Sequence, residues 1–205
     1  QLLPAMSPVV VGEEHRFLAK SQMEALGLFP DFRILLEPYG KNTAPAICGA
    51  AAYVSSQGRG NDVLLVLPAD HLILKPQAFA IAVREAAELA RQGRIVTFGI
   101  VPDHPETGYV YIANGEGCSV ASFVEKPDLA TAERYCTSGN YLWNSGMFAW
   151  KASTILAAIE RFLPALHQGL LQIRAALDTD REGEVVDRVY TGLQAVSIDH
   201  GVMEK

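Results

Sequence analysis

The sequence predicts a mixed α/β fold with a mostly parallel sheet and helices on both faces. Short apolar segments rich in β-branched residues alternate with longer segments of helical periodicity. One of them, Val63–Leu67, is apolar throughout, which is typical of a central strand covered on both faces. The links between the segments are short, and such an alternation favours parallel strands connected by helices.

The first half of the chain follows this alternation regularly. Strands are expected at Val9–Val11, Arg33–Leu36, Val63–Leu67 and Ile95–Ile100, and helices at Glu13–Leu26, Asn42–Ser56 and Pro76–Arg91. Asn42 or Thr43 is a suitable N-cap for the second of these helices, and Pro45 stands in its first turn.

The second half is less regular. Strands are expected at Tyr109–Ala113, Val120–Val124, Met147–Trp150 and Val196–Ile198, and helices at Leu129–Ser138 and, interrupted by Pro164, at Ala152–Leu177. No internal repeat or linker divides the chain, so we expect one domain over residues 1–205. Because the chain begins with Gln1 and ends at Lys205 without a terminating feature, we expect this domain to be incomplete at both ends.

The composition is that of an ordinary globular protein. Apolar residues make up 49% of the 205 residues and charged residues 20%, which argues against intrinsic disorder. The formal net charge of −6 disfavours nucleic acid and membrane surfaces as partners. No apolar run reaches the roughly 20 residues needed to span a membrane. The three cysteines fit no zinc-binding pattern, so we expect a reducing, cytoplasmic location.

Asp70 is the candidate metal ligand. It follows the apolar segment Val63–Leu67 within "PADH", and ligands of open α/β sheets bind at the carboxyl ends of the strands. A carboxylate at this place suits Mg²⁺, which prefers hard oxygen ligands and keeps several of its waters. The alternative is that Asp70 caps the next segment or begins a turn.

Glu125 and Lys126 also stand at a strand end. They follow Val120–Val124, and such a pair could bind sugar hydroxyls and a phosphate, respectively. A solvated surface pair ended by Pro127 is the alternative.

Glu37 stands at the end of Arg33–Leu36 and precedes a helix that begins with free N–H groups. A carboxylate matches the adjacent N1–H and N2 amine donors of guanine, and Gly40 allows an unusual backbone conformation nearby. An ordinary link from strand to helix is an equally good interpretation.

Two further positions raise questions of their own. Gly108, in "PETGYVYI", could let a ligand approach the backbone closely, although a hairpin glycine would explain it as well. In "NYLWNSGMFAWK", Asn144, Ser145 and Gly146 stand among residues that belong in a core. A buried Asn lowers stability unless its amide is hydrogen-bonded, so Asn144 bonds either the protein's own backbone or a ligand.

Several motifs, taken in order, resemble one family. They are "EPYGKNTAPA", "LLVLPADH", "TFGIVPDHPETGY", "FVEKPDLATAERY", "YLWNSGMF" and "SIDHGVMEK". Together they are similar to the successive motifs of the mannose-1-phosphate guanylyltransferases, in particular the bacterial long-chain type that is often fused to a phosphomannose isomerase domain. Val110 stands where this family usually has Gly, and His200-Gly201 where it has Tyr-Ala.

The resemblance implies a Rossmann-like nucleotidyltransferase (GT-A-like) fold that makes GDP-mannose and pyrophosphate from GTP and mannose 1-phosphate. It implies catalytic roles for Asp70, as the Mg²⁺ ligand, and for Lys126, at the sugar phosphate. The implied substrate contacts are Glu125 and Asn144 to the mannose hydroxyls, Gly108 to the sugar through its backbone, Glu37, Asn42 and Thr43 on the guanine side, and Lys205 to a phosphate.

The resemblance leaves some features open. A homodimer and a fused isomerase domain in the native chain are further expectations. The Gly-rich loop "GGxGxRLWPLSR" of the family and its second metal-binding aspartate are absent from the sequence, so we expect this fragment alone to be inactive. The alternatives are a sister enzyme for another sugar 1-phosphate or base, and a non-catalytic nucleotide-sugar sensor on the same fold. A sensor would tolerate the loss of Asp70 or Lys126, and both are present.

Overall fold

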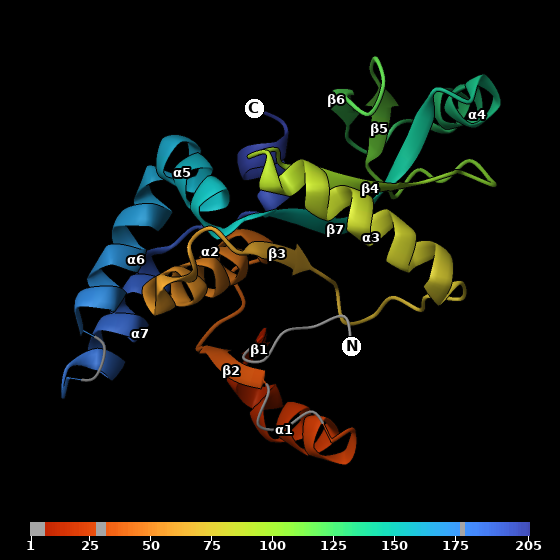
Figure 1. The fold of residues 1–205 in the computed structure, drawn as a ribbon. Coiled ribbons are helices and arrows are strands. Elements are labelled where there is room, and N and C mark those ends of the chain that lie inside the picture. The colour runs from red at the N-terminus through yellow and green to blue at the C-terminus, as the bar shows by residue number, and fades with distance from the viewer. Residues whose placement is uncertain (1–6, 28–31, 177–178) are drawn as a thin grey trace. The chain divides into compact units, whose positions relative to one another are not determined.

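The computed structural model describes residues 7–27, 32–176 and 179–205. The chain forms two compact units. Figure 1 labels their helices and strands. The first unit holds the described residues of 7–62 and 152–203 with Lys205, and the second holds residues 63–151 with Glu204. No helix in the described part of the chain is long and apolar enough to cross a lipid bilayer.

The first unit contains a parallel pair of strands. β1 (Ser7–Gly12) and β2 (Phe32–Glu37) pair in parallel, with Val9 opposite Ile34. The helices of this unit are α1 (Arg16–Ala25), α2 (Thr43–Val54), α5 (Ala152–Phe162), α6 (Pro164–Ala176) and α7 (Glu182–Gly192), with short helical turns η1 (Glu13–His15), η2 (Ser55–Arg59) and η3 (Asp199–Met203). Both α1 and α2 contact the strand pair.

The core of the first unit forms where α2 packs against α5 and α6. α2 is rich in alanine, whose small side chain lets helices approach closely, and Ala44 and Ala51 are fully buried, as is Ile159 of α5. The helix begins at Thr43 because Asn42 caps it: Asn42 Oδ1 accepts a hydrogen bond from the Thr43 N–H at 2.8 Å.

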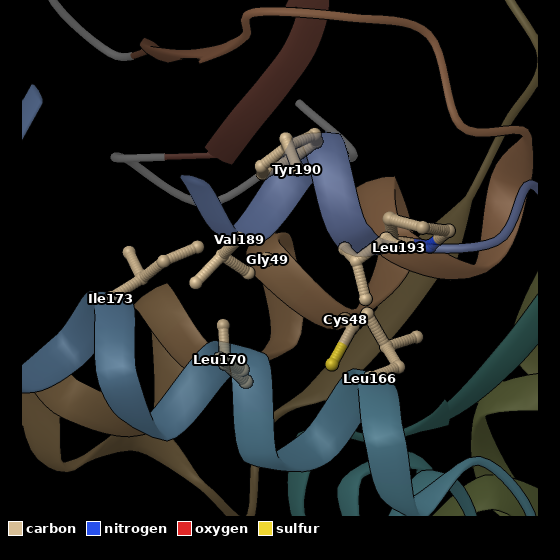
Figure 2. A pocket seen from close by; sticks show the side chains of 9 residues that line it. Cys48, Gly49, Leu166, Leu170, Ile173, Val189, Tyr190 and Leu193 are labelled. Atoms are coloured by element: carbon tan, nitrogen blue, oxygen red, sulfur yellow. The ribbon is translucent and has the colours of Figure 1, made fainter. Parts of the chain in front are cut away.

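A small apolar cavity of about 20 Å³ lies among α2, α6 and α7 (Figure 2). It is lined by Pro45, Cys48, Gly49, Leu166, Leu170, Ile173, Val189, Tyr190 and Leu193. Burial raises the pKa of the Cys48 thiol to about 12, so this thiol stays protonated at neutral pH. The cavity has room for about one water molecule or one methyl group, which makes it a packing defect rather than a substrate site.

Gly49→Ala should stabilise the protein by filling part of this cavity. A Cβ at Gly49 would meet no atom within 4 Å, and alanine is favoured over glycine in a helix interior by about 1 kcal/mol. We expect the urea-unfolding midpoint of the full-length protein to rise by an amount equivalent to about 1 kcal/mol.

Gly169→Ala in α6 is the matched control. A Cβ at Gly169 would lie 2.8 Å from Cγ1 of Val189 in α7, and the branched valine side chain cannot easily move aside. This variant should lose about 1 kcal/mol, because overpacking outweighs the gain in helix propensity. Equal stabilisation by both substitutions would contradict the close packing of α6 on α7.

The second unit is a five-stranded sheet in which β7 (Tyr141–Lys151) pairs with three others. The remaining elements are β3 (Val63–Val66), β4 (Val96–Ile100), β5 (Tyr111–Asn114), β6 (Val120–Val124), α3 (Pro76–Arg91) and α4 (Leu129–Ser138). α3 packs on β3, β4 and β7 through Ala86 and Ala90. Ala132 of α4 packs with Tyr111 and Trp143.

β7 has neighbours along both edges. Phe148 and Ala149 each pair with both β3 and β4, and Trp143 pairs with both β4 and β5. Because a residue can have one neighbouring strand on each side, β4 lies along one edge of β7, and β3 and β5 share the other. Residues 144–147 of β7 therefore lie between the parts that pair with β5 and with β3.

The predicted α/β class is confirmed, with a smaller parallel share than expected. The described pair β1–β2 is parallel, whereas the described pairs of the second unit are antiparallel. The expectation that Val63–Leu67 is a central strand covered on both faces is wrong. Residues Val63–Val66 are half-buried, and among the described strands β3 pairs with β7 alone.

Most other elements are confirmed at their predicted positions, and α3, β6 and α4 have the predicted bounds. The helix predicted at Ala152–Leu177 is broken before Pro164 into α5 and α6, as expected, and Leu177 lies outside the described residues. The strand predicted at Val196–Ile198 is wrong. Val196 instead exchanges backbone hydrogen bonds with Lys41 and Ala44.

Candidate active site

Asn144, Ser145 and Gly146 form a bulge in β7. Asn144 and Phe148 of β7 pair with Gly99 and Thr97 of β4. Between these two pairs β7 holds more residues than β4, and the register shifts there. Gly146 has a φ of +68°, which favours glycine. A bulge of this kind bends a strand and redirects its side chains, and such bulges are common next to active sites.

Polar side chains stabilise the bulge from within. Asn144 Oδ1 accepts hydrogen bonds from the Thr97 hydroxyl at 3.1 Å and from the Gly146 N–H at 3.2 Å. The Ser145 hydroxyl donates to the carbonyl oxygen of Phe98 at 2.6 Å. These bonds explain why Asn and Ser stand among core residues, since buried polar groups require partners. Contact of Asn144 with a sugar stays a prediction.

The turn that carries Asp70 begins beside this bulge. β3 ends at Val66, opposite Phe148, and a methyl group added at Gly146 would lie 3.7 Å from Cγ of Pro68. The Asp70 side chain is exposed, and it has no hydrogen bond or ion pair with any residue in the described ranges.

Asp70 fits one ligand of a magnesium ion. Exposed carboxylate oxygens are the hard donors that Mg²⁺ prefers, and the ion commonly completes its shell with waters and substrate phosphates. Within the part of the chain that the structure describes, no group of three His, Cys, Asp or Glu side chains could hold a metal ion. A magnesium site here would therefore depend on Asp70 together with water and phosphate oxygens.

Glu125 and Lys126 directly follow the end of β6, which pairing through β5 places level with the start of the bulge. β6 ends at Val124, which pairs with Tyr111, and Tyr111 pairs in turn with Trp143. Lys126 Nζ lies 3.5 Å from Glu125 Oε1, and both side chains are more than half exposed. An exposed pair of this kind adds about 0–1 kcal/mol to stability, so the fold does not require it.

The backbone of Lys126 is strained. Its φ is +34°, a conformation that a residue with a side chain rarely adopts. Strain of this kind costs about 1–3 kcal/mol and is concentrated at active sites and ligand-binding segments. The strained backbone of Lys126 therefore supports a functional role over the alternative of a solvated surface pair.

The loop before β5 brings Gly108 to the bulge. The Asn144 N–H donates to the Val110 carbonyl at 2.8 Å, so the segment just after Gly108 runs beside β7. Gly108 lies outside the β5–β6 hairpin, and the hairpin explanation of this glycine is wrong. Its N–H donates to a carboxylate oxygen of Glu106 at 2.8 Å.

Two aromatic side chains of this loop were missed in the sequence. The rings of His104 and Tyr109 both pack edge-on against Trp143, with centroid distances of 4.9 and 5.3 Å. Tyr109 is half-exposed beside Gly108. The signal in the sequence that could have identified Tyr109 is its place directly after Gly108 and at the start of a predicted strand.

In the first unit, Glu37 is buried at the carboxyl end of β2. It is only 9% exposed, and its Oε1 accepts a hydrogen bond from the Tyr190 hydroxyl at 3.2 Å. Burial raises the pKa of Glu37, and the bond from Tyr190 partly lowers it. Burial also raises the pKa of Tyr190, so this hydroxyl remains a donor at neutral pH.

Asn42 and Thr43 stand on the exposed start of α2. Asn42 has a φ of +68° and a ψ of −169°, a region that is essentially restricted to glycine. The Thr43 hydroxyl oxygen accepts a hydrogen bond from the Ile198 N–H at 2.9 Å. Lys205 is also exposed, and its N–H donates to the Val202 carbonyl at 3.2 Å.

Glu37→Gln should change how stability depends on pH. The folded-state pKa of Glu37 is raised from its ordinary 4.5. The protonated side chain therefore adds to the free energy of unfolding below pH 4.5, and this contribution is lost as the pH rises through the folded-state pKa. Glutamine carries no charge and keeps an oxygen acceptor for Tyr190. Urea unfolding at about pH 4 and about pH 7 measures this: relative to the wild type, the unfolding free energy of the variant should be higher at pH 7 than at pH 4. A gain confined to the acidic side would contradict this account.

Comparison with known proteins identifies the family. A family model described as nucleotidyl transferase matches residues 5–180, which is most of the chain. The chain belongs to the nucleotidyl transferase family. The nucleotidyl transferase part of the resemblance drawn from the ordered sequence motifs is thereby confirmed, and the bulge and the strand ends beside it lie within the matched residues.

Named relatives of this nucleotidyl transferase chain are similar to it over nearly its whole length. It is 48% identical over 206 residues to the xanthan biosynthesis protein XanB of Xanthomonas campestris pv. campestris (strain B100). This match covers 98% of the chain and 44% of XanB. It is 42% identical over 211 residues to a mannose-1-phosphate guanylyltransferase of Escherichia coli (strain K12), over 97% of the chain and 44% of that protein. The chain thus spans less than half the length of these curated relatives.

A solved structure has the same fold. The crystal structure described as mannose-1-phosphate geranyltransferase from Thermus thermophilus matches with a TM-score of 0.82 and 34% identity. The match covers 97% of this chain and 56% of that one.

Proposed function

We propose that the full-length protein is a mannose-1-phosphate guanylyltransferase, which makes GDP-mannose and pyrophosphate from GTP and mannose 1-phosphate. The observation that carries this proposal is the convergence of strand ends on one bulge in β7. The residues beside these ends are Asp70, Gly108 and Lys126. The Escherichia coli relative bears this activity in its name, and the name of XanB supports a role in polysaccharide biosynthesis.

The reaction requires positioning and charge neutralisation more than proton transfer. A phosphate oxygen of mannose 1-phosphate attacks the α-phosphorus of GTP, and the bond from that phosphorus to the pyrophosphate group breaks. The nucleophile is already ionised at neutral pH, so no general base has to activate it. The protein must hold two anions in line and offset their charge.

In the second unit, Lys126 would bind the phosphate of mannose 1-phosphate, and Glu125 would accept hydrogen bonds from mannose hydroxyls. Gly108 and Asn144 would complete the sugar side, where Asn144 also holds the bulge in shape. The exposure of Glu125 and Lys126 and the strained backbone of Lys126 support these roles.

Asp70 would hold a magnesium ion, because its carboxylate is exposed and of the right donor type. When bound, this ion would offset the charge that develops on the phosphate groups of GTP. In the first unit, Glu37, Asn42 and Thr43 would form the guanine side, and Lys205 would contact a phosphate.

Three further features belong to the same proposal. A homodimer is retained from the sequence analysis. A fused isomerase domain is retained as well, because the relatives are more than twice as long as the matched part. A cytoplasmic location is retained because all three cysteines are free thiols.

Isotope labelling of the full-length protein's reaction tests the proposed bond changes. With ³²P in the phosphate of mannose 1-phosphate, the label should appear in GDP-mannose. With ³²P in the γ-phosphate of GTP, it should appear in pyrophosphate. Label from mannose 1-phosphate in pyrophosphate would contradict attack on the α-phosphorus.

A further inference from the structure

The segment from Glu37 to Thr43 is fastened to residues about 150 positions away in the sequence. The Tyr190 hydroxyl donates to Glu37 Oε1 at 3.2 Å, and the Tyr39 hydroxyl donates to the Asp187 carboxylate. Tyr190 and Asp187 both belong to α7, a helix that the sequence analysis did not predict. Two hydrogen bonds between a tyrosine and a carboxylate therefore join this helix to the segment. The segment accepts one of them through Glu37 and donates the other through Tyr39.

The residues after α7 add further bonds to the same segment. Lys41 Nζ donates to the Leu193 carbonyl at 2.8 Å. The Val196 N–H donates to the Lys41 carbonyl at 3.1 Å, and the Val196 carbonyl accepts at 3.1 Å from the N–H of Ala44, the residue directly after the segment. The segment is thus held along its whole length and not only at one point.

Strain at Asn42 indicates why so many bonds are needed. Its φ of +68° and ψ of −169° lie in a region that costs a residue with a side chain about 1–3 kcal/mol. Such a conformation persists only where the surrounding structure imposes it, and it is concentrated at ligand-binding segments. Tyr39, Gly40, Asn42 and Thr43 are exposed, whereas Glu37 is buried. The segment therefore presents polar groups outward from a fixed base.

We propose that Tyr190 and Asp187 are positioning residues that hold the segment Glu37–Thr43 in the shape required for nucleotide binding. Glu37 then contributes to the guanine side as the buried base of the segment, through its bond with Tyr190, and does not itself touch the guanine. This inference rests on the proposed function, which gives the segment the guanine side. It deepens that function by assigning the shape of the nucleotide site to α7.

Tyr190→Phe and Asp187→Asn in the full-length protein test the inference. Tyr190→Phe removes the bond to Glu37, whereas Asp187→Asn keeps an oxygen acceptor for Tyr39 but takes away its negative charge. Both substitutions keep the size of the side chain. Tyr190→Phe should raise the KM for GTP about tenfold, because a bond to a charged group is lost. Under the same conditions kcat and the KM for mannose 1-phosphate should stay within about twofold. Asp187→Asn should act in the same direction with a smaller effect. Arg188→Gln, on the same helix with an exposed ion pair to Glu184, is the control and should leave all three constants unchanged.

Hydrogen exchange measured by mass spectrometry gives a second readout that needs no activity. The amides of residues 39–43 should exchange at least about fivefold faster in Tyr190→Phe than in the wild type, while those of α5 should not change. Unchanged exchange, or an equal rise in KM for both substrates, would overturn the inference. A wild-type protein that releases no pyrophosphate from GTP would overturn the proposed function instead, and the exchange comparison would still decide whether α7 holds the segment.

Discussion

Asp70→Asn in the full-length protein should lower the rate of pyrophosphate release by about 100-fold or more, as the loss of a group that stabilises transition-state charge typically does. The amide is a much weaker ligand for Mg²⁺ than the carboxylate. The exposed Asp70 side chain has no partner among the described residues, so the unfolding free energy should change by less than about 0.5 kcal/mol. Steady-state kinetics over a range of Mg²⁺ concentrations, with urea unfolding alongside, measures both quantities.

Asp62→Asn is the matched control for this prediction. Asp62 precedes β3, whereas Asp70 follows it, and the Asp62 side chain makes only an exposed ion pair with Arg59. Its replacement should leave activity within about twofold. Full Mg²⁺-dependent activity in Asp70→Asn would remove Asp70 from the metal site.

Lys126→Ala should raise the KM for mannose 1-phosphate by about 10- to 100-fold and the KM for GTP by less than about threefold. The reason is that a charged bond to the sugar phosphate is lost while the guanine side in the first unit is untouched. Initial rates measured over a grid of both substrate concentrations separate the two effects. An equal rise in both KM values would contradict the assignment of Lys126 to the phosphate of mannose 1-phosphate.

Lys126→Asn separates the charge of this residue from its strained backbone. Asparagine tolerates a positive φ better than most residues, so this variant should be at least as stable as the wild type and yet bind mannose 1-phosphate as poorly as Lys126→Ala. Lys75→Ala, which removes an exposed lysine before α3 in the same unit, should leave both KM values unchanged.

The local part of the fold was predictable because it depends on local patterns. Pro76 and Arg91 bound α3 as the helical periodicity indicates, and Asp128 caps α4 by accepting from the Thr131 N–H at 2.8 Å. Strand direction was less predictable, because it depends on which strands meet. A reader of the sequence sees Met147–Trp150 as a short strand, whereas in the structure it belongs to β7, to which β3, β4 and β5 all pair antiparallel.

The candidate site was predictable at strand ends and not beyond them. The sequence raised the question of why polar residues follow Trp143, and the structure answers it with a bulge that Asn144 and Ser145 stabilise. The partners of Glu37 could not be predicted, since Tyr190 is separated from it by 153 positions. Its helix α7 mixes glycine and β-branched residues, which weakens the helical pattern.

Pyrophosphate release by the full-length protein, with Mg²⁺ and a panel of nucleoside triphosphates and sugar 1-phosphates, tests the central claim most directly. Release should require both GTP and mannose 1-phosphate and should stop when the metal is chelated. Release with another pair of substrates would retain nucleotidyl transfer but contradict the assignment of guanine and mannose. Absence of release with every pair would contradict the enzymatic account and favour a nucleotide-sugar sensor.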